Sequence, residues 1–174
     1  MPPPKSTTNW TFSGIHHVGL TVSDIDRSIE FYRDVLGLTL IRQRPKVDAD
    51  YVVKQTGYKG VELSVASFSL GPRGAPSLEL AQYLNYPGPP SDQSTHRPGN
   101  SHLCLVVSDF LACYEDLRAK DVRFKSEPVT IGAGPNTGGM VAYLFDPDGH
   151  AIELFQPPDP QPPGAQLSSD EESA

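Results

Sequence analysis

The chain has little cysteine: only Cys104 and Cys113 occur among its 174 residues. The surrounding pattern places Cys104 in a strand and Cys113 in a helix, so we expect no disulfide between them. The sequence also lacks a secretory signal pattern and any apolar run of about 18 residues, the length that a membrane-spanning helix needs. These absences predict a soluble protein of the reducing cytoplasm that does not bind membranes.

Basic residues are scarce as well. The chain has 14 lysines and arginines against 21 aspartates and glutamates, for a formal net charge of −7. A protein that binds nucleic acid needs a basic patch to neutralise the phosphates. We therefore do not expect nucleic acid as a partner.

The two ends of the chain have few apolar residues that could pack. Residues 1–13 and 157–174 together hold 8 of the 18 prolines, and the second stretch has four acidic residues and no basic one. Such stretches bury too little apolar area to offset the entropy lost on ordering. We expect two disordered tails, the C-terminal one acidic and proline-rich, and a single domain between them at residues 14–156.

What the chain does contain is an internal repeat. Residues 16–22 alternate as a strand should, and residues 24–36 then follow the spacing of a helix. Residues 100–120 repeat both elements at an offset of 85 positions, which carries His17 onto His102. Two copies indicate an internally duplicated domain rather than a solenoid, which needs three or more units.

Three further strands are expected in each copy. In the first copy they are residues 39–41, 61–68 and 77–83, and in the second copy residues 122–125, 140–145 and 151–155. The predicted fold class is therefore α+β, with two paired βαβββ modules. The modules are residues 14–84 and 99–156, joined by a proline-rich linker at residues 85–98.

Four polar residues occupy equivalent mid-strand positions of the two modules: His17, Glu79, His102 and Glu153. Each has apolar neighbours that point the other way, so each faces away from the helix-covered side of its sheet. Taken singly, a Glu on such a face is usually solvated, and a His in a strand is usually a structural residue. Two imidazoles and two carboxylates gathered between two facing sheets would instead need to pair with one another or to hold a cation. This N₂O₂ set suits a divalent transition metal, namely Zn, Ni, Co, Mn or Fe(II).

The repeated pattern H-x-x-L-x-V-x-D, at residues 17–24 and 102–109, is followed by a helix and later by I/L-E-L. It resembles the vicinal oxygen chelate superfamily, which includes glyoxalase I, methylmalonyl-CoA epimerase, extradiol dioxygenases, fosfomycin-resistance enzymes and bleomycin-binding proteins. The resemblance covers residues 14–156 and implies an open mixed-sheet barrel around a metal cavity. It also implies a homodimer, with each site built within one chain or across two.

By the same resemblance, the four ligand positions of glyoxalase I and methylmalonyl-CoA epimerase fall on His17, Glu79, His102 and Glu153. Such a centre leaves two coordination positions for a small carbonyl or thioester substrate, whose enediolate form the ion stabilises. Glu79 or Glu153 would move the α-proton as general base, and the sequence does not choose between them. The reaction expected is that of a lyase or an isomerase.

Two other activities of the superfamily stay open. An extradiol dioxygenase would use Fe(II) with two His and one carboxylate, so Glu79 is one ligand too many for that activity. A metal-free binding or antibiotic-resistance protein would have no reason to keep any of the four ligands. The turn at residues 146–149 differs from the one expected in the epimerases, which weakens the case for a CoA substrate.

Other residues have weaker claims to a role. Thr21, Tyr83 and Cys104 share the predicted ligand face and could line a substrate pocket, although packing explains them equally well. Asn136 and Thr137 lie in a glycine-rich loop, residues 132–139, that we expect to form a mobile edge of the cavity rather than a plain hairpin. Four residues are expected to be solvated, three of them arginines that could otherwise anchor an acidic substrate: Arg42, Arg44, Arg73 and His150.

Overall fold

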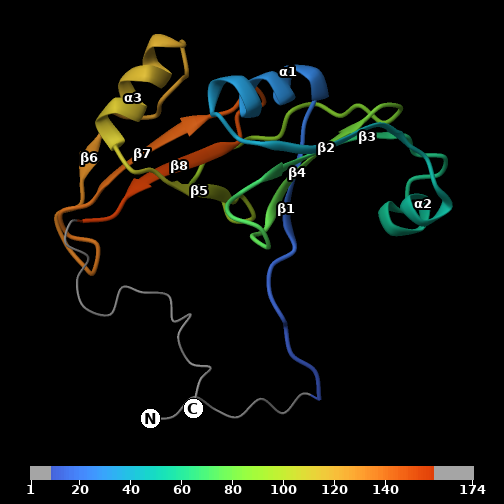
Figure 1. Ribbon diagram of the computed structural model, residues 1–174. Helices are drawn as coiled ribbons and strands as arrows, with labels where there is room; N and C mark the ends of the chain where they lie inside the picture. Colours follow the sequence, from blue (N-terminus) through green and yellow to red (C-terminus); the bar gives the residue numbers. More distant parts are fainter. Residues whose placement is uncertain (1–8, 159–174) are drawn as a thin grey trace.

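The computed structural model describes residues 9–158. Residues 1–8 and 159–174, which make up most of the two predicted disordered tails, lie outside the described residues. Two four-stranded sheets form the body of the protein (Figure 1). Sheet A has the strand order β1-β4-β3-β2 and sheet B the order β5-β8-β7-β6. The α+β fold of two duplicated modules is confirmed, and the sheets stay open rather than closing into a barrel.

The strands of the two sheets have matching topologies. Sheet A comprises β1 (His17–Thr21), β2 (Leu40–Val47), β3 (Leu63–Ser69) and β4 (Ser77–Tyr83). Sheet B comprises β5 (His102–Val106), β6 (Val129–Thr130), β7 (Met140–Phe145) and β8 (Ala151–Gln156). In each sheet the first strand pairs in parallel with the last strand of its module, and the other pairs are antiparallel.

One helix follows the first strand of each module. Helix α1 (Ile25–Glu30) continues as a π-helical turn, η1 (Phe31–Val35), and α3 (Phe110–Ala119) is its counterpart. Their first N–H groups are capped by the side chains of Asp24 and Asp109. Both predicted helices are therefore present. None of the helices in residues 9–158 has the length and apolar composition needed to cross a membrane.

A second helix cap, which the sequence did not reveal, also occurs in both modules. The Gln82 side-chain oxygen accepts a hydrogen bond from the Ile25 N–H at 3.1 Å. The Gln156 oxygen accepts one from the Phe110 N–H at 2.6 Å. Each glutamine thus ties the start of its helix to the last strand of the same module.

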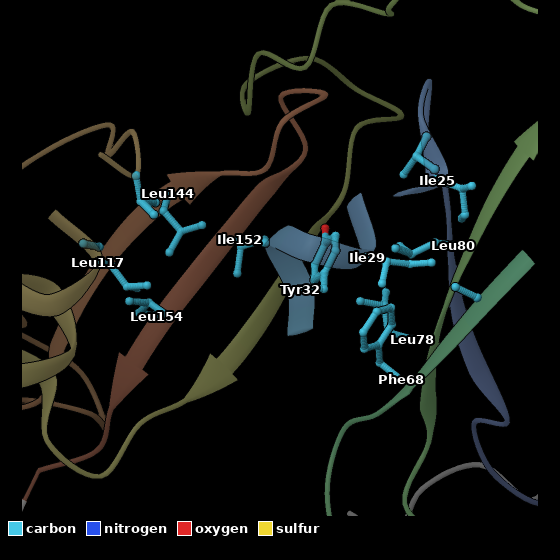
Figure 2. Close-up of a cluster of buried hydrophobic side chains, with 14 of the residues drawn as sticks. Ile25, Ile29, Tyr32, Phe68, Leu78, Leu80, Leu117, Leu144, Ile152 and Leu154 are labelled. Carbon is cyan, nitrogen blue, oxygen red and sulfur yellow. The ribbon is translucent and has the colours of Figure 1, made fainter. Parts of the chain in front are cut away.

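The main apolar core extends across both modules. Helix α1 and the η1 turn that follows it lie between the two sheets, and Ile29 of α1 and Tyr32 of η1 point into the cluster (Figure 2). Sheet A contributes Phe68 and Leu78, and sheet B contributes residues such as Ile152, all of them buried. Because this cluster includes residues of both sheets, the two modules share one apolar core.

Polar contacts cross the same boundary. The Asp148 carboxylate accepts hydrogen bonds from the backbone N–H of Ser23 at 3.0 Å and from the guanidinium of Arg27 at 2.8 Å. His150 Nε2 lies 2.9 Å from the Thr21 carbonyl oxygen, so the expectation of a solvated His150 is wrong. The turn at residues 146–149 therefore joins sheet B to the start of α1.

The structure departs from the predicted elements in four places. Strand β2 continues to Val47 instead of ending at residue 41. Residues 50–56 form a helix, α2 (Asp50–Thr56), which is too short to show a clear period in the sequence. Residues 122–125 contribute only one bridge, from Phe124 to Leu144, and the edge strand of sheet B is β6 instead. The loop at residues 132–139 joins the antiparallel strands β6 and β7, so it is a hairpin connection after all.

Candidate metal site

The predicted ligand face exists in both sheets. Exposure alternates along β1, where His17, Gly19 and Thr21 are exposed and the residues between them are partly buried. Strand β5 has the same alternation, with His102 and Cys104 exposed. Helices α1 and α3 lie over the opposite side of the sheets (Figure 1). Each His therefore lies on the open face of its sheet, as the sequence predicted.

In sheet A, Glu79 lies beside Gly19 in the parallel pairing of β1 and β4, one pleat along from His17. The Glu79 side chain is only partly exposed because it comes from an inner strand. The Nδ1 atoms of His17 and His16 lie 2.8 Å apart. One imidazole and one carboxylate thus share the open face of sheet A.

In sheet B the corresponding pair is in direct contact. His102 Nε2 lies 2.9 Å from Glu153 Oε2, with 43% of the His side chain and 22% of the Glu side chain exposed. Glu153 occupies the same place beside Cys104 that Glu79 occupies beside Gly19. We call the two sets the sheet A pair (His17 and Glu79) and the sheet B pair (His102 and Glu153).

Tyr143 adds a group to the sheet B pair that sequence reasoning missed. It lies directly opposite Glu153 in the pairing of β7 and β8. Its ring packs edge-on against the His102 ring, with centroids 5.3 Å apart. Burial raises the pKa of the Tyr143 hydroxyl, and the charge of Glu153 and a hydrogen bond to it raise that pKa further. The alternation of residues 140–145 was the signal that could have placed Tyr143 on this face.

The two pairs remain separate within one chain. Among residues 9–158, no group of three or more His, Cys, Asp or Glu side chains is arranged to hold a metal ion. Each pair offers one imidazole nitrogen and one carboxylate oxygen, donors that suit a divalent transition metal. Each pair thus fits half of the predicted ligand set.

The predicted pocket residues are distributed over different places. Thr21 and Tyr83 line a cavity of about 280 Å³ between the modules, beside prolines of the linker. Cys104 lines a largely apolar groove of about 440 Å³ beside the end of the first helix. Asn136 and Thr137 line neither of these, and the Thr137 hydroxyl donates a hydrogen bond to the Gly134 carbonyl within its own loop. The five residues do not form one pocket in the single chain.

A second apolar cluster covers part of the open face of sheet A. Val52 of α2 is buried there together with Val61, Leu63 and Val65. Ala81, two positions after Glu79 on β4, packs against this cluster. Helix α2 therefore packs on the same face of sheet A as the sheet A pair.

Known proteins resemble this chain along most of its length. It is 33% identical over 144 residues to the lactoylglutathione lyase of Haemophilus influenzae, covering 82% of this chain and 91% of that protein. It is also 33% identical over 152 residues to the 2-epi-5-epi-valiolone epimerase of an Actinomyces species, covering 83% of this chain and 79% of that protein.

Solved structures show the same fold. A glyoxalase family protein from Bacillus cereus superposes with a TM-score of 0.74 at 17% identity, over 88% of this chain and 99% of that one. The trypanothione-dependent glyoxalase I of Leishmania major superposes with a TM-score of 0.57 at 26% identity, over 82% and 86%. Residues 14–154 also match the sequence profile of one family. The chain therefore belongs to the glyoxalase/bleomycin resistance protein/dioxygenase superfamily.

Proposed function

We propose that this protein is a divalent-metal-dependent lyase or isomerase that moves a proton alpha to a carbonyl group of a small carbonyl or thioester substrate. The observation that carries the proposal is the repetition of a His–Glu pair at the same register on the open face of both sheets. Packing does not require this repetition, because both pairs lie outside the buried core. The relatives named as a lyase and an epimerase support the same class of reaction.

The complete site in this proposal belongs to a homodimer. Within residues 9–158 of one chain the two pairs do not form a common metal site, and His17 and His102 are both exposed. Two chains related by a two-fold axis would place the sheet A pair of each chain opposite the sheet B pair of its partner. Such a dimer would have two equivalent sites.

The chain's own carboxylates would handle the proton. When bound, the metal would supply positive charge that stabilises the oxygens of an enediolate. Glu153 Oε2 lies 2.9 Å from His102 Nε2, and Tyr143 lies opposite Glu153 on the neighbouring strand. The Glu79 side chain has no such contact among residues 9–158, so we assign Glu79 as the base that takes and returns the α-proton.

The substitution Glu79→Gln tests the assignment, because it removes the basic oxygen and keeps the shape. Turnover of a panel of α-hydroxy thioesters and hemithioacetals should fall by about 10²–10⁴, the usual contribution of a positioned acid–base group. Metal content should fall only modestly. The matched control is Glu115→Gln, which removes the same charge from an exposed position on α3 and should leave turnover unchanged.

Two further measurements separate this reaction from ring cleavage. Wild-type protein in deuterated water should incorporate deuterium into product and consume no oxygen. Oxygen uptake that survives Glu79→Gln, without deuterium exchange in the wild type, would instead assign the protein to the dioxygenases. A protein that only sequesters its ligand would bind it equally well before and after the substitution.

A further inference from the structure

Two arginines of β2 lie on the open face of sheet A. In the pairing of β2 with β3, Arg42 is opposite Ser67 and Arg44 is opposite Val65. Ser67 is in turn opposite Glu79 on β4. Because residues paired across strands point to the same face, both arginines share the face of the sheet A pair. The sequence offered no means to choose this face, since β2 contains register shifts.

Neither arginine has an acidic partner among residues 9–158. Other basic residues on the surface do, as Arg27 pairs with Asp148 and Lys46 with Glu62. Arg44 is the more unusual of the two, because its Nε is the one side-chain nitrogen or oxygen of the described residues that is buried without a hydrogen-bond partner. A buried N–H without an acceptor destabilises the folded protein. The two terminal guanidinium nitrogens of Arg44 are not buried and also lack a hydrogen-bond partner among residues 9–158, so an anion would be bound there.

Comparison of the two modules shows that packing does not require an arginine here. The row that contains Arg44 in sheet A runs through Thr21, Ala81 and Val65. The equivalent row of sheet B consists of four apolar residues, Val106, Phe155, Val141 and Val129. Val129 therefore stands in sheet B where Arg44 stands in sheet A, and the charge is specific to one module.

We propose that Arg44, assisted by Arg42, binds an anionic group of the substrate, a carboxylate or a phosphate. This inference rests on the proposed function and names the substrate class of the same site. Neighbouring strands are about 4.7–4.9 Å apart, so β2 lies roughly 10 Å across the sheet from Glu79 on β4. The guanidinium forks match the oxygens of either anion. The substrate would place its reacting carbonyl near Glu79 and its anionic end at Arg44.

The row that joins Arg42 to Glu79 runs through Ser67 of β3, whose side chain is partly exposed. Val65, which lies between Arg44 and β1, is only 4% exposed because α2 covers it, so it offers no surface to a ligand. The substrate class is therefore a carbonyl compound that also carries an anionic group.

The Arg44 Nε–H gives a direct test that needs neither metal nor turnover. Two probes, succinate and methyl phosphate, are titrated separately into ¹⁵N-labelled protein, and the arginine Nε–H resonances are followed by NMR. The Arg44 resonance should shift and saturate with at least one probe, and the tighter probe identifies carboxylate or phosphate as the anion. Arg73, an exposed arginine in a turn, is the internal control and should not shift.

The variant Arg44→Val copies the residue that sheet B has at the equivalent place, so the fold should be retained. It should weaken binding of the preferred probe at least tenfold by calorimetry, while Arg73→Gln changes nothing. Equal binding by Arg44→Val and wild type, or equal shifts at Arg44 and Arg73, would overturn the inference. If wild-type protein binds the probe but shows no deuterium exchange, the proposed function is contradicted rather than the role of Arg44. The two outcomes are distinct because probe binding does not depend on the reaction.

Discussion

Tyr32 and Asp146 form a buried polar contact between residues that are distant in sequence. The Tyr32 hydroxyl donates to Asp146 Oδ2 at 3.0 Å, and the other carboxylate oxygen accepts from the backbone N–H groups of Asp148 and His150. Burial and the charge of Asp146 raise the pKa of the Tyr32 hydroxyl, which therefore remains a donor. At the scale of the residue, this contact holds the turn of one module against the helix of the other.

Removing the Tyr32 hydroxyl tests how much its contact with Asp146 contributes to stability. We expect Tyr32→Phe to lower the free energy of unfolding by about 1.5–3 kcal/mol, the range for hydrogen bonds to charged groups. Urea denaturation measures the change. Tyr51→Phe alters an exposed ring on α2 and should stay within about 0.5 kcal/mol of wild type. A Tyr32→Phe protein as stable as wild type would show that the two backbone donors suffice for Asp146.

At the scale of the element, α2 is held by tertiary packing rather than by its own sequence. It has seven residues, and no side chain caps its first N–H groups. So short a helix is marginal in isolation. Val52, which is 3% exposed, anchors it to sheet A. The cover that α2 gives to part of the open face of sheet A therefore depends on this one contact surface.

Val52→Ala should weaken the attachment of α2. Loss of two buried methyl groups, together with the cavity they leave, is expected to cost about 1–3 kcal/mol of unfolding free energy. The control is Lys54→Ala on the exposed side of the same helix, which should change stability little. If Val52→Ala and Lys54→Ala have equal effects, the second apolar cluster does not hold α2 in solution.

The turn that carries Asp148 makes the module boundary sensitive to acid. Burial opposes ionisation of Asp148, but hydrogen bonds from Ser23 and the charge of Arg27 outweigh it and hold the pKa of the carboxyl below its usual value. A carboxyl whose pKa is lowered on folding stabilises the protein above its unfolded-state pKa, about 3.9 for Asp, and loses this contribution as the pH falls through the folded-state pKa.

Asp148→Asn should therefore destabilise the protein by a constant amount above about pH 5, with the difference from wild type shrinking below about pH 4. Urea denaturation at a series of pH values measures both curves. Asp48→Asn, at a side chain that is 61% exposed, should follow the wild-type curve throughout. If the difference in stability between Asp148→Asn and wild type grows as the pH falls, folding does not lower the pKa of Asp148.

At the scale of the whole molecule, the proposed site requires one His–Glu pair from each of two chains. His17→Ala and His102→Ala should each abolish activity, because each removes a ligand from both sites of the homodimer. A heterodimer of the two variants keeps one intact site. Random mixing by joint refolding should therefore restore about a quarter of wild-type activity. If the mixture stays inactive although heterodimers form, the complete site lies within a single chain.

Metal should also stabilise the assembly. Without it, the carboxylates of the two pairs would face one another with no counter-charge, which disfavours their ionised forms. Chelation should lower the melting temperature, and added divalent ion should restore it, because a ligand that binds only the folded state stabilises that state. A melting temperature that is the same with and without chelator would favour a metal-free binding protein.

The sequence by itself determined the elements whose signals are local. The strand alternation of residues 16–22, the helical spacing of residues 24–36 and their repetition at residues 100–120 predicted the β1–α1 and β5–α3 units. Side chains alternate between the two faces of a strand, so the position of His17 in its strand predicts that it lies on the open face. The offset of 85 residues gives His102 the same position in its own strand. The duplicated α+β fold followed from the same repeat.

The tertiary structure decided what depends on contacts between distant residues. The formation of α2 depends on burial against β3, and the face of Arg44 depends on the register of β2 with β3. The two open sheets pack around α1 (Figure 2), and no local pattern specifies this packing. It decides that the two His–Glu pairs stay separate within the described residues. The alternation of a strand predicts the face on which a side chain lies. Only the packing of the sheets decides which residues that side chain contacts.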